Sequence, residues 1–304
     1  MKHLRIGGYG PGVVTIDDGK EHGLARVTAP SFLAAHPTLP VLYAVGELER
    51  GWLTAFEATS ELTPFDERPS EGHSPCHVAV DPTGTLLAAA NYGDGTAVVY
   101  HLDERGAFTG EPLVLRNEGS GPDAERQEGP HAHQCVFHDG LLHVSDLGTD
   151  EIRRYRPDGT RLESITLSPG TGPRHFAFAG DRLYVAGELD GTVTLIDGER
   201  RTSVPASRQE GANSPSHLQL DGDFVYVANR GPNTVSVLRA GDLSHVAEVP
   251  TGGDWPRHFA IDGEHMYVAN QYANTVTRFT LRDGVPAPDG EAYEVDSPAC
   301  VLVM

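Results

Sequence analysis

The stretch Gly172-Pro173-Arg174-His175-Phe176 decides the fold, because related segments return along the whole chain. Each related segment has a small or turn-forming start, a proline or its equivalent, and then the beginning of an apolar run. They are residues 29–33, 74–78, 132–136, 214–218, 255–259 and 297–301. The marker prolines, spaced by 45, 55, 43, 42, 41 and 42 residues, are Pro30, Pro75, Pro130, Pro173, Pro215, Pro256 and Pro298. A search for such periods comes before any local assignment, and here it gives seven units.

The units continue alike after the marker, with a short turn, an apolar run such as residues 183–186 and a β-rich stretch such as residues 192–196. β-Branched and aromatic residues bounded by Gly, Asp, Asn and Pro predict strands, and no long helical period appears. Units of this length with four strands each are typical of propeller blades. The sequence therefore predicts an all-β fold, a seven-bladed β-propeller, with residues 1–304 forming a single domain.

The two ends of the chain complement one another. The last unit has only a first strand, residues 300–303, whereas the chain begins with strands at residues 4–6 and 12–16 that lack an inner partner. Pairing of the N-terminal strands with the C-terminal strand would remove two open sheet edges. We expect this pairing to close the ring.

The composition of the chain limits the kinds of partner and cofactor that we expect. The net charge of −20 argues against nucleic acid, because phosphate contacts need clustered Lys and Arg. No apolar stretch approaches membrane-spanning length and the first residues do not resemble a signal peptide, so we expect a cytoplasmic protein without membrane contact.

Cys76, Cys135 and Cys300 lie far apart in apolar runs, which predicts buried reduced thiols. No ligand spacing for a metal is evident, and we expect no cofactor and no essential metal.

Two sets of residues should face one end of the central channel. In an antiparallel blade, the residue that enters the innermost strand and the residue that leaves the second strand lie at the same end. The entering residues are Ser31, Cys76, His133, Arg174, Ser216, Arg257 and Ala299. The leaving residues are Tyr9, Glu47, Tyr92, Leu147, Glu188, Arg230 and Gln271. The longest loop, residues 117–129, opens at the same end and could cover the mouth.

Residues that differ from blade to blade on this rim are the informative ones. His133, Arg174, Glu188, Arg230 and Arg257 stand out. Guanidinium groups bind carboxylates and phosphates in bidentate fashion, so the set suits a small anion. The arginines could equally do no more than pair with nearby carboxylates, and the sequence leaves both readings open.

Histidines fall into two groups. Four of them recur one position further along the innermost strand, which favours a structural role in hydrogen bonding between blades. These are His77, His175, His217 and His258. His131 has no repeat partner and lies close to the mouth, so it joins Arg257, Gln271 and Tyr92 as a candidate for substrate binding.

Four stretches resemble motifs of a known family over nearly the whole chain and in the same order. They are residues 126–133, 172–175, 184–189 and 227–231. The family is that of the propeller-type lactonases, which includes 6-phosphogluconolactonase and the 3-carboxy-cis,cis-muconate lactonizing enzymes. The resemblance implies that His133, Arg174, Glu188 and Arg230 are the catalytic residues.

The resemblance leaves the reaction open between lactone hydrolysis and cyclisation. If the protein is a carboxylic ester hydrolase, a neutral His133 would activate water while Arg174 and Arg230 stabilise the oxyanion. The best candidate substrate is then 6-phospho-D-glucono-1,5-lactone. The alternatives are a muconate-type cycloisomerase, in which the same histidine moves a proton, and a non-catalytic propeller that binds a protein or metabolite. A covalent mechanism through Ser31, Ser216, Cys76 or Cys135 lacks a nucleophile elbow.

Overall fold

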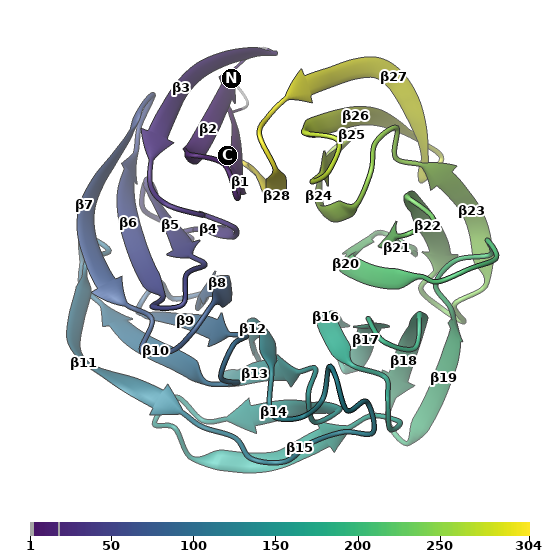
Figure 1. Cartoon of the computed structure of the whole chain (residues 1–304), viewed down its shortest axis with the longest axis horizontal. Coiled ribbons are helices and arrows are strands. Elements are labelled where there is room, and N and C mark those ends of the chain that lie inside the picture. The colour runs from purple at the N-terminus through teal and green to yellow at the C-terminus, as the bar shows by residue number, and fades with distance from the viewer. Residues whose placement is uncertain (1–2, 18) are drawn as a thin grey trace.

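The computed structural model describes residues 3–17 and 19–304, which form 28 strands and no helix. The strands make seven four-stranded antiparallel sheets, arranged as blades around a central axis (Figure 1). The prediction of an all-β seven-bladed propeller is therefore confirmed. No helix that could cross a membrane is found in the described part of the chain, and the cytoplasmic location stays a prediction.

The blades are numbered here from the one that holds β1, and each is given from the axis outwards. Blade 1 consists of β28 (Pro298–Val303), β1 (His3–Gly8), β2 (Gly12–Asp17) and β3 (Lys20–Arg26). Blade 2 consists of β4 (Leu33–Ala35), β5 (Val41–Gly46), β6 (Trp52–Ala58) and β7 (Leu62–Pro69). Blade 3 consists of β8 (Pro75–Val80), β9 (Leu86–Asn91), β10 (Ala97–Leu102) and β11 (Phe108–Leu115). Blade 4 consists of β12 (Ala132–His138), β13 (Leu141–Asp146), β14 (Glu151–Tyr155) and β15 (Arg161–Thr166).

The second half of the ring repeats this plan. Blade 5 consists of β16 (Pro173–Ala179), β17 (Arg182–Gly187), β18 (Thr192–Asp197) and β19 (Arg200–Pro205). Blade 6 consists of β20 (Ser214–Asp221), β21 (Phe224–Arg230), β22 (Thr234–Arg239) and β23 (His245–Pro250). Blade 7 consists of β24 (Pro256–Asp262), β25 (His265–Asn270), β26 (Thr275–Arg282) and β27 (Val285–Glu294).

Blade 1 closes the ring. β28 pairs antiparallel with β1, with Leu4 opposite Val303 and Ile6 opposite Val301. The backbones of His3 and Met304 also exchange two hydrogen bonds of 3.0 and 2.9 Å. The predicted pairing of the N-terminal strands with the C-terminal strand is confirmed, and the innermost edge of β1 is covered.

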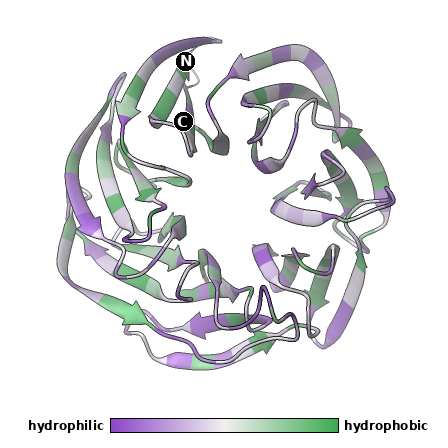
Figure 2. Cartoon of the chain, viewed as in Figure 1, coloured by the Kyte–Doolittle hydropathy of each residue, from purple (hydrophilic) through white to green (hydrophobic). Residues whose placement is uncertain are grey.

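The core lies between the blades. Seven apolar clusters fill the seven blade interfaces; the one between blades 2 and 3, for example, joins Tyr43 and Leu53 to Leu87 and Val98. Second strands such as β5 and β9 are buried at every residue, which explains their continuous apolar sequences. Figure 2 shows that outer strands such as β7 and β19 are more hydrophilic. Within each blade, the strands thus become more hydrophilic with distance from the axis.

Tyrosines on second strands join neighbouring blades. Tyr43, Tyr184 and Tyr226 each donate a hydrogen bond of 2.7 Å from the hydroxyl to a carbonyl oxygen in a turn of the next blade. These acceptors lie between the third and fourth strands. A buried tyrosine needs such a partner, so these bonds fix the spacing between blades at the end of the ring opposite the candidate site.

The recurring histidines meet in the central channel. His77 Nδ1 accepts from the Cys135 amide at 3.4 Å and His258 Nδ1 accepts from the Val301 amide at 3.3 Å. His175 and His217 share a 2.8 Å hydrogen bond between their Nδ1 atoms. Each of these bonds joins two blades, so the predicted hydrogen bonding between blades is confirmed. Phe32 lies among them, with its ring centroid 4.1 Å from that of His77.

Candidate functional site

Glu188 lies at the centre of a group of arginines at one end of the channel. It follows β17 directly, and its Oε2 lies 2.9 Å from Nε of Arg174 and 2.8 Å from Nη2 of Arg230. Its other oxygen, Oε1, lies 2.7 Å from Nη2 of Arg126. Arg174 is the second residue of β16 and Arg230 the last residue of β21, as the antiparallel blade geometry requires. Blades 5 and 6 and a loop therefore meet at one carboxylate.

Burial makes these ion pairs strong. The side chains of Glu188, Arg174 and Arg230 are only 6, 4 and 6% exposed, so water and salt screen their charges little. Burial alone would raise the pKa of Glu188, but Arg230 and Arg174 hold it well below its usual range. Burial, together with the charge of Arg230, lowers the pKa of Arg174 to about 9. The carboxylate is therefore ionised, and the group that it forms with Arg126, Arg174 and Arg230 has one negative and three positive charges.

Backbone carbonyls fix the two buried arginines. Arg174 Nη1 donates to the Ser216 carbonyl oxygen, and Arg230 donates from Nε to the Ser214 carbonyl oxygen at 2.9 Å. Within residues 3–17 and 19–304, Nη2 of Arg174 and Nη1 of Arg230 have no hydrogen-bond partner. Two guanidinium donors are therefore free for a ligand oxygen.

His133 lies beside this group on β12. Its side chain is buried, and burial together with the positive charge of Arg174 lowers its pKa well below 6.5. The ring contacts that of Tyr92 edge to face, with 5.6 Å between centroids. His133 is consequently a neutral imidazole at neutral pH, the form in which a histidine can accept a proton.

The opposite side of the mouth has a second polar group. Arg257 Nη1 lies 3.4 Å from Oε1 of Gln271, and its guanidinium carbon lies 5.3 Å from the ring centroid of Tyr9. The hydroxyl of Tyr9 donates to Glu47 at 2.8 Å. Glu47 raises the pKa of Tyr9 in addition to the larger effect of burial, so this hydroxyl stays protonated. Here one arginine faces one carboxylate, and the local charge is balanced.

A narrow cavity of about 10 Å³ separates the two groups, which is room for about one water molecule. It is lined by Ser31, Phe32, Glu47, Cys76, Arg174, His175, Arg257 and Ala299. Phe32 and His175 belong to the aromatic layer that fills the channel. The mouth therefore has a closed floor, and a substrate would enter from the rim.

Cys76 is the thiol nearest to the histidine. Its Sγ lies 3.8 Å from Nδ1 of His133 and 3.4 Å from the carbonyl oxygen of the same residue. Burial and Glu47 raise the pKa of this thiol well above its usual value, so it is protonated and weakly nucleophilic. All three cysteines are buried and free, as the sequence predicted.

The structure brings together His133, Arg174, Glu188 and Arg230, and places Arg257, Gln271 and Tyr92 around the same mouth. His131 differs. Its Nδ1 lies 2.8 Å from the Tyr92 carbonyl oxygen and its Nε2 lies 3.1 Å from Oε1 of Glu128. Its ring stacks on Tyr92 with 4.6 Å between centroids. Both nitrogens have a partner, and these contacts hold the loop against blade 3.

Arg126 is the residue that the repeat pattern does not identify, because it lies outside the blades. The signal for it was its place in the stretch 126–133. The loop that carries it contacts the mouth through this side chain, and a cover formed by residues 117–129 stays a prediction.

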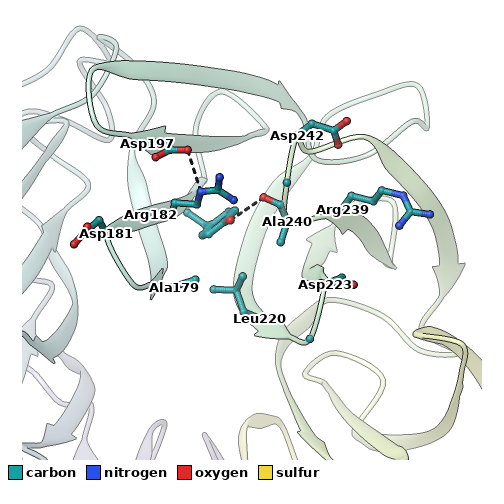
Figure 3. A pocket seen from close by; sticks show the side chains of 12 residues that line it. Ala179, Asp181, Arg182, Asp197, Leu220, Asp223, Arg239, Ala240 and Asp242 are labelled. Atoms are coloured by element: carbon teal, nitrogen blue, oxygen red, sulfur yellow. Dashed lines mark hydrogen bonds and ion pairs between the residues drawn. The ribbon is translucent and has the colours of Figure 1, made fainter.

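A much larger cavity than the one at the mouth lies elsewhere. A cavity of about 830 Å³ opens between blades 5 and 6 at the opposite end of the ring (Figure 3). Arg182 Nε pairs with Asp197 at 3.0 Å there, and Asp181, Asp223 and Asp242 lie around it. None of the candidate residues lines it, so its size does not make it the functional site.

Among the described residues, no group of three His, Cys, Asp or Glu side chains is arranged to hold a metal ion.

The chain is similar to known proteins over most of its length. A family model described as "Lactonase, 7-bladed beta-propeller" matches residues 18–303. A protein of Bacillus subtilis named 6-phosphogluconolactonase is 33% identical over 257 residues, which cover 76% of this chain and 73% of the relative. A protein of the same name from Formosa agariphila is 30% identical over 284 residues, covering 81% and 80%. A crystal structure of a protein from Lactobacillus plantarum superposes with a TM-score of 0.90 at 28% identity and covers 100% of both chains.

Proposed function

The chain belongs to the lactonase family of seven-bladed β-propellers, and we propose that it hydrolyses a small anionic sugar lactone at the mouth of its channel. The proposed substrate is 6-phospho-D-glucono-1,5-lactone, since two relatives are named 6-phosphogluconolactonase. Lactone hydrolysis makes the protein a carboxylic ester hydrolase. No cofactor takes part in the proposed reaction.

One observation carries the proposal. A neutral histidine and two arginines with free donors share a mouth that holds an excess of positive charge. A protein of net charge −20 would repel an anionic substrate, and this local excess offsets the repulsion.

The proposed steps follow from these groups. His133 accepts a proton from a water molecule as the water oxygen bonds to the lactone carbonyl carbon. The carbonyl oxygen becomes an oxyanion and takes hydrogen bonds from Arg174 Nη2 and Arg230 Nη1, which are already in place. The bond between the carbonyl carbon and the ring oxygen then breaks. The ring oxygen takes the proton from His133, and the open-chain acid is released.

Glu188 supports these steps without touching the reacting atoms. It holds Arg174 and Arg230 through one oxygen, so the two guanidinium groups converge. Because the guanidinium groups are held in place before the reaction, their reorientation adds no free energy to the barrier.

The test is hydrolysis by purified protein of 6-phospho-D-glucono-1,5-lactone, with the spontaneous rate subtracted. We expect hydrolysis well above that rate, and a loss of about 10²–10⁴-fold in His133→Ala. His101→Ala, which changes an exposed histidine on β10, should retain the wild-type rate. A wild-type rate equal to the spontaneous one would overturn the proposal.

Cyclisation of an unsaturated dicarboxylate could use the same residues, and an ultraviolet assay with muconates distinguishes it. Turnover of muconate without turnover of the lactone would make the protein a cycloisomerase. A protein that binds the lactone and turns over neither substrate would be a binding propeller.

A further inference from the structure

The loop between β11 and β12, residues 116–131, is tied down at several points. The buried side chain of Gln127 donates from Nε2 to the Leu147 carbonyl oxygen at 2.8 Å. Its Oε1 accepts from the Asp123 amide at 3.2 Å. Asp123 Oδ1 in turn accepts from the amides of Glu125 and Arg126 at 2.9 and 3.1 Å. These bonds place Arg126 at the mouth, although its residue lies outside the blades.

Arg126 is bound differently from the other two arginines of the group. Arg174 and Arg230 are buried and tied to backbone carbonyls, whereas the Arg126 side chain is 41% exposed. Its Nη2 serves both of its side-chain contacts, Oε1 of Glu188 at 2.7 Å and the Tyr92 hydroxyl at 3.1 Å. In the described part of the chain, its Nη1 and Nε meet no acceptor. These two donors belong to the most exposed of the three arginines, so they are available to a ligand that arrives from solvent.

The two oxygens of Glu188 separate Arg126 from the other arginines. Oε1 binds Arg126 alone, and Oε2 binds both Arg174 and Arg230. The donors proposed for the oxyanion thus lie on one side of the carboxylate, and the exposed donors lie on the other. A substrate with a reactive carbonyl at one end and an anion at the other would find a partner for each.

We propose that Arg126 binds the phosphate of the substrate and thereby determines the preference for a phosphorylated lactone over a neutral one. This rests on the proposed lactonase function. Nη1 and Nε of Arg126 point to different edges of the guanidinium, and each has an N–H that can donate to a phosphate oxygen while Nη2 stays with Glu188. The contact through Nη2 to Glu188 keeps the guanidinium at the mouth before the substrate arrives.

The test compares two lactones in two variants. The substrates are 6-phospho-D-glucono-1,5-lactone and unphosphorylated D-glucono-1,5-lactone. In Arg126→Met, which keeps much of the side chain and removes the charge, we expect KM for the phosphorylated lactone to rise about tenfold or more. The neutral lactone should lose no more than a few-fold in kcat/KM, through loosening of Glu188. Arg126→Lys keeps the charge but replaces the guanidinium donors with a single ammonium group, so it should recover part of the lost preference.

Arg116→Met is the matched control, because Arg116 is an exposed arginine at the start of the same loop. It should leave both kcat/KM values as in the wild type. An equal loss for both lactones in Arg126→Met would overturn the proposal, since Arg126 would then act only by positioning Glu188.

A second measurement does not depend on turnover. Inorganic phosphate should raise the Tm of the wild-type protein and of Arg116→Met, and raise that of Arg126→Met much less. Equal shifts in all three proteins would overturn the phosphate role of Arg126. If the wild type hydrolyses neither lactone and phosphate still protects it through Arg126, the lactonase function fails and the anion site stands.

Discussion

Oε2 of Glu188 lies 2.8 Å from Nη2 of Arg230, inside a group where both side chains are almost completely buried. An ion pair in such surroundings differs from one on the surface. Its formation costs much desolvation free energy, and its loss leaves a buried charge without a partner.

Glu188→Gln should therefore lower the free energy of unfolding by about 3 kcal/mol, because Arg174 and Arg230 lose their common counter-charge. Urea denaturation measures the change. Glu151→Gln is the control, since Glu151 pairs with Arg161 at 3.1 Å on the surface and should cost less than about 1 kcal/mol. Equal losses in the two variants would mean that the buried group is not strongly coupled.

The pH profile of hydrolysis should report the low pKa of His133. A general base works only when unprotonated, and burial beside Arg174 keeps this imidazole neutral to a pH well below 6.5. We expect kcat/KM, corrected for spontaneous hydrolysis, to stay level from pH 8 to below pH 6.5 and to fall only at lower pH. A fall centred at pH 6.5 or above would contradict the role of a buried neutral base.

The channel histidines should make the fold sensitive to acid. Burial lowers the pKa of His77, His133, His175, His217 and His258, so they stay neutral in the folded protein. In the unfolded chain each takes up a proton near pH 6.5. Below that pH the unfolded state binds more protons, and the free energy of unfolding falls as pH is lowered. The slope approaches about 1.4 kcal/mol per pH unit for each histidine.

Urea denaturation at several values from pH 7.5 to pH 5 tests this slope. His217→Gln should reduce it by about one proton, and His101→Gln, on the exposed face of β10, should leave it unchanged. Constant stability from pH 6.5 to pH 5 would show that the layer is already protonated or open to water.

Trp255 combines an unusual backbone with a contact to the site. Its φ of 62° lies in the left-handed region, and its ring centroid lies 5.3 Å from the guanidinium carbon of Arg230. The ring also stacks on the exposed ring of Tyr272.

Trp255→Gly and Trp255→Ala both remove the ring, so both should raise KM by loosening Arg230. Gly tolerates the left-handed conformation and should be the more stable of the two by about 1 kcal/mol. Thermal denaturation and lactone kinetics check the two parts, and a more stable Ala variant would contradict the backbone argument.

The blades could be read from the sequence because each is made of consecutive strands with its own turn and apolar signals. The rim positions followed from antiparallel geometry, which is why Arg174, Glu188 and Arg230 could be placed together. Closure of the ring followed from the missing strands at the two ends. These relationships depend on local pattern and on the repeat.

The loop residues could not be placed in this way. Arg126 reaches Glu188 because Gln127 binds the Leu147 carbonyl oxygen, a contact between parts of the fold that no local pattern encodes. His131 was expected as a candidate for substrate binding, and the contacts of its nitrogens with the Tyr92 carbonyl oxygen and with Glu128 could not be foreseen. Such contacts depend on which surfaces the assembled blades present.

The junction of β1 with β28 also sets an order of events during synthesis. Leu4 leaves the ribosome almost three hundred residues before Val303, the residue that it finally faces. Blades 2 to 7 can form as their strands emerge, but the inner side of β1 has no partner until residues 298–303 have been made. Contacts so distant in sequence form slowly, and the nascent chain must keep one bare strand edge from associating with other chains until translation is complete.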